Sequence, residues 1–265
     1  MEPNVTGRGA VDNFCGDQPD FGTVVGMPRS RPLPEESHGH AFLTSDRGAY
    51  GLTRGRLRGI DVEHPFHGVS AIDVDPAEID SRCSTYLPLM APGQFFSHVT
   101  AAALFGMPLP LFLIREEPIH VAVLGSATRP RTRGIVGHGL SAADVTTCLI
   151  RGFPAVSPAD TWCHLGSVLS KEDLVAAGDY LISGARAEWG RMPALARIEE
   201  LTAARIRHRG RRGARRVTWA LERLRSPVDS RPESLLRLLL VAAGTPSRWS
   251  TIRRWSTVVR RCTQI

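Results

Sequence analysis

Helix-start signals constrain the fold of this chain most. In the segments 75–78, 157–160 and 170–173 an aspartate or serine is followed three residues later by an acidic residue, the pattern of an N-cap whose side chain accepts a backbone N–H. Two of these segments also carry proline directly after the cap, where the missing N–H costs nothing. The segments 75–78, 157–160 and 170–173 therefore predict helices over 76–87, 161–169 and 172–182. Capping also explains the acidic cluster better than a metal site does; the cluster is Asp73, Asp75, Glu78 and Asp80.

Short β-branched runs separated by turn-forming residues predict a small sheet, and apolar stripes at helical spacing predict further helices. The expected fold class is therefore α+β, with a small mixed α/β domain over residues 75–190 and a helical segment over 191–244. Residues 1–40 have no apolar period and are expected to be disordered. Gly210 and Gly213 are expected to interrupt the helical segment. We expect strands at 120–124, 134–138 and 145–150, an apolar loop at 107–114, and helices at 97–106, 193–225 and 233–243.

Residues 41–74 have the outline of a partial winged helix-turn-helix. A short helix is expected from Thr44, followed by a turn at Gly51 and a second short helix that Thr53 caps. Residues 64–72 then form a glycine-containing extended segment that fits a wing. The second helix carries Arg54, Arg56 and Arg58.

Basic residues gather in the last third of the chain. Residues 186–265 hold 19 of the 33 Lys and Arg residues but only 6 of the 26 Asp and Glu residues. Such a field attracts phosphate backbones and releases counterions on binding. A solvated helical face explains the same charge equally well. The candidate phosphate contacts are Arg211, Arg212, Arg215 and Arg216 in this region, and Arg129, Arg131 and Arg133 on an expected hairpin loop before it.

Several other kinds of protein and site lack sequence support. No apolar run is long enough to span a bilayer and no signal peptide is present, so we expect a cytoplasmic protein without a membrane partner. The five cysteines are scattered, which argues against a disulfide framework or a zinc site. No nucleotide, dinucleotide or hydrolase motif occurs, so no cofactor is expected. Pro65 disfavours a metal site at His64 and His67, and Cys163 and His164 would point apart on a helix.

Three blocks in the middle of the chain carry a family resemblance. The segment FFSHVTAAALFGMPLP at 95–110, the strand at 120–124 and the segment GFPAVSPADTWCHL at 152–165 resemble actinobacterial proteins related to the AbiEi antitoxins of type IV toxin-antitoxin systems. The resemblance implies a DNA-binding antitoxin or transcriptional regulator whose genetically linked partner is a nucleotidyltransferase-like toxin. Residues 42–69 resemble the winged helix of that family. By this resemblance the residues facing DNA would be Thr53, Arg54, Arg56 and Arg58.

The C-terminal part resembles a nuclease domain that breaks off. Residues 231–244, RPESLLRLLLVAAG, look like the first helix of the very-short-patch-repair endonucleases, with Glu233 at the position of the helix carboxylate. Such nucleases need further carboxylates to hold the metal that activates water. Residues 245–265 contain no Asp or Glu and depart from the family, as a shifted reading frame would cause. We therefore expect no metal site, no catalytic residue and no enzymatic activity.

Two functions of different kinds follow from these patterns. In the first, the protein is a regulator or antitoxin that reads an operator through the major groove and anchors phosphates with arginines. In the second, it is the inactive remnant of a nuclease fusion, which folds but neither cuts nor regulates. A third alternative, a residual endonuclease, requires metal-dependent cleavage of duplex DNA that Glu233→Gln abolishes.

Overall fold

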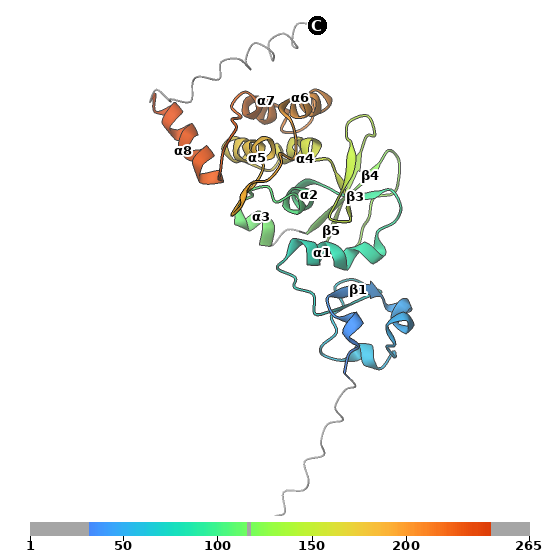
Figure 1. Cartoon of the computed structure of the whole chain (residues 1–265). Coiled ribbons are helices and arrows are strands. Elements are labelled where there is room, and N and C mark those ends of the chain that lie inside the picture. The colour runs from blue at the N-terminus through green and yellow to red at the C-terminus, as the bar shows by residue number, and fades with distance from the viewer. Residues whose placement is uncertain (1–31, 116–117, 245–265) are drawn as a thin grey trace, which may run out of the picture. The chain divides into compact units, whose positions relative to one another are not determined.

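The computed structural model describes residues 32–115 and 118–244. The chain has the expected α+β class: a five-stranded mixed sheet is packed against helices (Figure 1). The strand order is β5-β4-β3-β7-β6, in which β4 and β5 are parallel, β3 and β7 are parallel, and the other neighbours are antiparallel. The strands are β3 (Gln94–Phe96), β4 (Ile119–Leu124), β5 (Ile135–Leu140), β6 (Thr147–Ile150) and β7 (Phe153–Val156).

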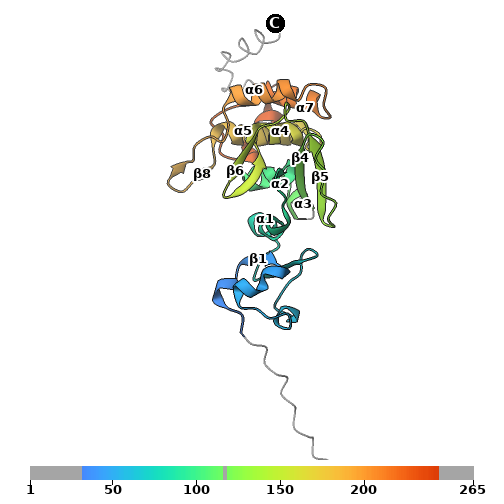
Figure 2. The same cartoon turned by 90° about the vertical axis from the view of Figure 1, so that its right-hand side faces the viewer.

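The helices stack in successive layers beside this sheet (Figures 1 and 2). Helix α2 (His98–Leu104) contacts β4, and α4 (Pro158–Leu165) packs on α2. Helices α6 (Ile198–Arg207) and α7 (Ala214–Leu221) cover α4 and α5 (Lys171–Ser183). The core between them is apolar and fully buried; its largest side chains include Phe96, Leu104, Trp162, Leu165, Leu174, Leu181 and Leu201.

Two of the three predicted N-caps are confirmed by hydrogen bonds. The Ser157 hydroxyl accepts the Asp160 N–H at the start of α4, and the Ser170 hydroxyl accepts the Asp173 N–H at the start of α5. The third prediction was wrong about the start, because Asp75 caps a turn by accepting the N–H of Ala77. Helix α1 (Ile79–Tyr86) begins only after that turn.

The predicted helix over 161–169 ends earlier than expected, at Leu165. Val168 follows Trp162 and Leu165 at helical spacing, but it is 41% exposed, whereas those two side chains are buried. The chain leaves the helix at Gly166, where a side chain would overlap Val217 of α7, and a side chain at Gly213 in the α6–α7 connection would overlap the Gly166 backbone. Close approach of these two backbones thus overrides the continuing apolar pattern.

The segment between β4 and β5 is not the hairpin loop that the sequence predicts. The two strands are parallel, so residues 125–134 must return along the sheet before β5 begins. The returning chain lies over Gly137 and Gly139 of β5, where a side chain would overlap the Pro130 carbonyl oxygen or the Arg129 guanidinium. Because glycine stands at these alternate positions, the loop can pack directly on one face of β5, while the His138 side chain lies on the other face.

The predicted helix-turn-helix is present only as short 3-10 turns. The 3-10 helix η2 (Thr44–Tyr50) ends at Gly51, as predicted, but the second helix is the three-residue η3 (Arg56–Arg58). Gly55 directly before η3 and Gly59 directly after it disfavour a longer α-helix. The wing segment contributes β2 (Val69–Ile72), which pairs antiparallel with β1 (His40–Leu43). A small separate core joins these parts; its residues are Phe42, Leu52, Leu57, Val62 and Ile72.

Other elements complete or correct the sequence predictions. Residues 111–115 form α3 (Leu111–Arg115), where an apolar loop was predicted. Part of the segment predicted to be disordered carries η1 (Glu35–Ser37), while residues 1–31 lie outside the described part. The predicted break between α6 and α7 is confirmed, because Gly210 and Gly213 both have positive φ angles. Two short strands, β8 (Arg186–Ala187) and β9 (Gly190–Arg191), form a hairpin.

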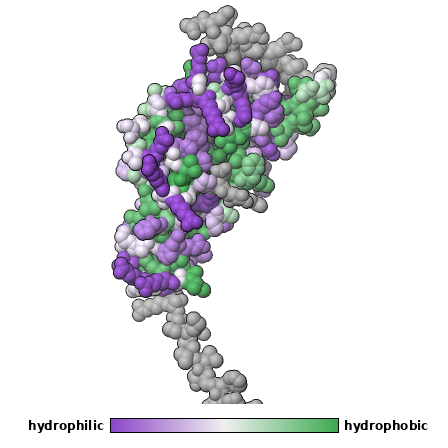
Figure 3. Space-filling model, turned by 180° about the vertical axis from the view of Figure 1, so that it is seen from behind, coloured by the Kyte–Doolittle hydropathy of each residue, from purple (hydrophilic) through white to green (hydrophobic). Residues whose placement is uncertain are grey.

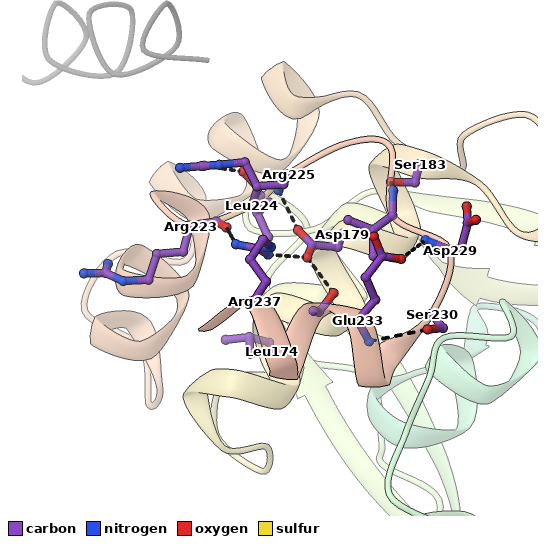
Figure 4. Close-up of polar contacts among 12 residues, drawn as sticks. Leu174, Asp179, Ser183, Arg223, Leu224, Arg225, Asp229, Ser230, Glu233 and Arg237 are labelled. Atoms are coloured by element: carbon purple, nitrogen blue, oxygen red, sulfur yellow. Dashed lines mark hydrogen bonds and ion pairs between the residues drawn. The ribbon is translucent and has the colours of Figure 1, made fainter. Parts of the chain in front are cut away.

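Helix α8 (Arg231–Ala242) confirms the predicted C-terminal helix and docks on α5 through a buried carboxylate (Figure 4). Asp179 is fully buried and accepts hydrogen bonds from Ser234 Oγ at 2.7 Å and from the Arg225 backbone N–H at 2.6 Å. Arg237 forms an ion pair with the same carboxylate at 2.6 Å. The outer face of α8 stays apolar and exposed, at the upper right of Figure 3; it comprises Leu236, Leu239, Leu240 and Val241.

Candidate functional site

Five histidines from five separate elements meet in one cluster. They come from the start of α2, from β4, from β5, from α4 and from the end of α6. Each ring lies within 5.7 Å of a neighbouring ring, measured between centroids. We call this the histidine cluster; its members are His98, His120, His138, His164 and His208.

The parallel β4–β5 pair places two of these side chains together. In its register His138 lies opposite Ala122, and His120 stands two residues away from Ala122 on the same strand. Side chains two residues apart share one face of a sheet, so His120 and His138 form a diagonal pair. His120 Nδ1 lies 3.0 Å from His138 Nε2.

Helices bring in the remaining imidazoles. His98 follows the N-cap residue Ser97 and has a φ of 51°, a left-handed conformation in which histidine is enriched. Its ring stacks on His138 at 3.8 Å and on His164 at 4.6 Å between centroids. His208, which ends α6, lies 5.7 Å from His164.

Burial favours the uncharged form of four histidines in this cluster. Removal from water, together with the neighbouring histidines, lowers the pKa of His98 to about 2. Burial also lowers the pKa of His138 and of His164, each to about 4, and lowers the pKa of His208. Near neutral pH these four imidazoles therefore carry lone pairs instead of charge, which is the form that binds metal ions.

One nitrogen of the cluster is buried and unsatisfied. His164 is only 7% exposed, and its Nδ1 has no hydrogen-bond partner within residues 32–115 and 118–244. A buried polar atom without a partner costs about 1–3 kcal/mol, so native proteins rarely leave one without a reason. This atom marks a place where a ligand or ordered water would find a partner.

A pocket of about 270 Å³ opens beside the cluster. Its lining combines the imidazoles of His98, His164 and His208 with the side chains of Arg211 and Arg212. Such a lining offers neutral nitrogen atoms next to guanidinium groups, which suits an anionic ligand.

The arginines around the pocket form an exposed basic surface, defined here as the α6–α7 surface of Arg209, Arg211, Arg212 and Arg215. Within the described residues, Arg209, Arg212 and Arg215 have no carboxylate in ion-pair contact. Arg211 forms an ion pair with Asp144. The predicted contact Arg216 is used internally, because its guanidinium donates to the carbonyl oxygens of Gly166 and Leu169.

The other predicted DNA contacts lie elsewhere. Arg129 packs over the glycines of β5, whereas Arg131 and Arg133 are exposed on the segment that leads to that strand.

In the N-terminal part, Arg54 and Arg58 are exposed, as is Thr53, whose Oγ accepts the Arg56 N–H at 3.2 Å. Arg56 itself forms a two-pronged ion pair with Asp61, at 2.8 and 2.5 Å. Its guanidinium is therefore already occupied by a carboxylate.

Sequence reasoning missed the histidine cluster and predicted no metal site. The pair considered instead, His64 and His67, is exposed, and the His64 ring lies against the backbone oxygens of Leu57 and Val69. The prediction that Cys163 and His164 point apart is confirmed, because Cys163 lies in the apolar core and His164 in the cluster.

Glu233, the expected relic of a nuclease, has a structural role. Its Oε2 accepts the backbone N–H of Asp229 at 2.8 Å, while Ser230 Oγ accepts the N–H of Glu233 (Figure 4). The Ser230 hydroxyl is thus the N-cap of α8, and the Glu233 carboxylate binds the backbone of the residue before that cap. The carboxylate is thus explained by the helix terminus.

No family model and no curated protein matches the chain. The crystal structure of the RV2827C protein from Mycobacterium tuberculosis is similar, with a TM-score of 0.41 and 18% identity over 69% of this chain and 71% of that chain. A likeness this distant carries no functional argument. Among the described residues no helix combines the length and apolarity needed to cross a membrane.

Proposed function

We propose that this protein binds DNA as a transcriptional regulator or antitoxin of the AbiEi-like kind, and that the α6–α7 surface contacts the phosphate backbone. The observation that carries the proposal is the set of exposed arginines without carboxylate partners in the described residues, Arg209, Arg212 and Arg215. They adjoin a pocket in which Arg211 and Arg212 face uncharged imidazoles.

Physical chemistry favours phosphate as the partner of this surface. A guanidinium presents N–H donors in a planar fork that matches two phosphate oxygens. Some exposed arginines elsewhere in the described chain are paired with acids, such as Arg186 with Asp229 and Arg197 with Glu200. The α6–α7 arginines, in contrast, bring a positive potential that their own surroundings leave largely uncompensated.

The test is a mobility-shift titration of the full chain with duplex DNA from upstream of its own gene, in EDTA and with excess unrelated competitor. We expect a shift that survives the competitor. The double variant Arg212→Gln/Arg215→Gln is expected to weaken binding at least about 10-fold, because two phosphates are no longer neutralised. The matched control Arg186→Gln/Arg197→Gln removes the same charge from arginines that are paired with acids, and it should bind nearly as well as the wild type.

Each contrary result has a clear meaning. Equal weakening by both double variants would show that only net charge matters, and would contradict the assignment to the α6–α7 surface. A shift that disappears under competition would leave nonspecific attraction and would contradict a regulatory role. Weakening by Arg54→Gln/Arg58→Gln would place DNA reading in the N-terminal part instead.

A further inference from the structure

We propose that the histidine cluster binds a zinc-class divalent transition-metal ion, with His98, His120 and His138 as its ligands. One potential ligand atom from each of these side chains lies within 4.8 Å of the other two. The inference is independent of DNA binding, since it concerns imidazoles of the sheet and of α2 and not the arginines of the α6–α7 surface.

The spacing of the nitrogens fits one shared ion. Imidazole nitrogens bind Zn²⁺ at about 2.0–2.1 Å, so two such ligands on a tetrahedral ion lie about 3.3 Å apart. The His120 and His138 nitrogens are 3.0 Å apart, and the third ring, His98, is stacked against His138. Small side-chain rotations would direct all three nitrogens at one point, because no two of them are more than 4.8 Å apart.

A second observation points to a ligand at the same place. His164 stacks on His98, is almost completely buried, and keeps an Nδ1 without a partner in the described chain. A water molecule on the metal ion would satisfy this nitrogen, as polar groups surrounding the ligands do at zinc sites. His164 is therefore assigned as a positioning residue for that water.

The donor set selects the class of metal. Three imidazole nitrogens suit zinc, copper, nickel or cobalt, whereas magnesium and calcium prefer oxygen ligands. Asp144, an acid in the pocket lining, is already paired with Arg211. A zinc-class ion with an exchangeable water is thus the occupant that this chemistry favours.

The experiment uses the full chain after treatment with a chelator, titrated with Co²⁺ near pH 7.5 in the absence of DNA. We expect visible absorption bands of low-symmetry Co²⁺ that saturate at one equivalent. Added Zn²⁺ should abolish these bands by competition, whereas added Mg²⁺ should leave them unchanged. Zinc should also raise the melting temperature of the protein, since it binds only the folded cluster.

Variants separate this site from chance binding. His138→Asn should lower zinc affinity roughly 100-fold or more, since changes to groups that merely support the ligands already cost 10- to 100-fold. His98→Asn should do the same, and asparagine tolerates the left-handed backbone at that position. The control His67→Asn alters an exposed histidine outside the cluster and should bind as the wild type does.

The proposal is overturned by several results. One such result is that the folded protein, as judged by its circular dichroism, shows no saturable cobalt absorption. The cluster would then be a set of hydrogen-bonded imidazoles without a metal. Another is equal loss of affinity in His67→Asn. If one cluster variant does not fold, the other supplies the comparison. If the protein binds no metal but still binds DNA in EDTA, this inference alone is refuted and the proposed function stands.

Discussion

Gly213 illustrates how one residue sets the packing of two helices. It has a φ of 86°, and a side chain there would overlap the backbone of Gly166. Gly210, three residues earlier, has a φ of 76° but faces open space. We expect Gly210→Ala to cost about 1 kcal/mol for the left-handed backbone alone, and Gly213→Ala about 3 kcal/mol because overlap is added.

Urea unfolding of the two variants measures this difference. Both substitutions add the same methyl group at a left-handed position, so Gly210→Ala is the matched control. Equal losses in the free energy of unfolding would mean that the contact with Gly166 is unimportant.

The cysteines allow a second prediction at this scale. Burial raises the pKa of Cys83 to about 12, and it raises the pKa of the half-buried Cys148 less far. Because the thiolate is the reactive form, at pH 8 only roughly one Cys83 in 10⁴ would be ionised. We expect a maleimide to label Cys148 in the folded protein well before Cys83, as read by mass spectrometry of peptides. Comparable rates at the two sites would show that the helix carrying Cys83 opens readily.

The same scale shows why the histidine cluster could not be predicted. His98, His120 and His138 stand in three different elements, and no two of them show the short, regular spacing of a metal motif. The meeting of His120 and His138 depends on the parallel pairing of β4 and β5, whereas the sequence predicted that a hairpin connects these two strands. The Gly137-His138-Gly139 alternation was the available signal, since it leaves one face of the strand without side chains.

At the scale of elements, α8 depends on one buried ion pair. Asp179 on α5 is fully buried, and Arg237 on α8 is its charged partner. Arg237→Met leaves the carboxylate without that partner, and we expect a loss of about 3–5 kcal/mol in the free energy of unfolding. Arg231→Met on the same helix removes the more exposed pair with Asp173 and should cost about 1 kcal/mol or less. Similar losses in the two variants would contradict a special role for Asp179.

The stability that the Arg237→Met variant loses relative to the wild type should also depend on pH, in a direction that the structure predicts. Burial already raises the pKa of Asp179, and Arg237 counteracts that rise. Without the arginine, the folded state holds its proton more tightly than the unfolded state, so stability falls as pH rises. We therefore expect the difference between variant and wild type to shrink as the pH is lowered from 7 to 5. Thermal melts across that range measure it, and a difference that grows on acidification would refute the assignment.

Helix positions were the most predictable elements, because capping is a local interaction. Ser157 and Ser170 act on backbone groups three residues away, and such signals can be read directly from a sequence. Strand pairing was less predictable, because β3 and β7 are short and pair with each other although they are remote in the chain. The 3-10 turns near Gly51 and Gly55 were also missed as such, since glycines mark where a helix stops but not which kind of helix precedes them.

At the scale of the whole molecule, the separation of charge leads to the last prediction. The basic excess of residues 186–265 was visible in the sequence, but the structure distinguishes arginines that are used internally, such as Arg216, from exposed ones such as Arg212. The slope of log affinity against log salt changes by about 0.9 for every phosphate that the protein neutralises.

Two fewer neutralised phosphates, in Arg212→Gln/Arg215→Gln, should therefore make the slope shallower by about 2, whereas Arg186→Gln/Arg197→Gln should leave it nearly unchanged. Fluorescence anisotropy of labelled duplex DNA across a salt series, in EDTA, measures both slopes. The slope reports how many phosphates are neutralised, and moderate losses of protein stability do not change it. A variant that is less stable but still folded would therefore keep the wild-type slope. Unchanged slope in the α6–α7 variant would mean that these arginines stay in water when DNA binds, and that phosphate is held by another surface.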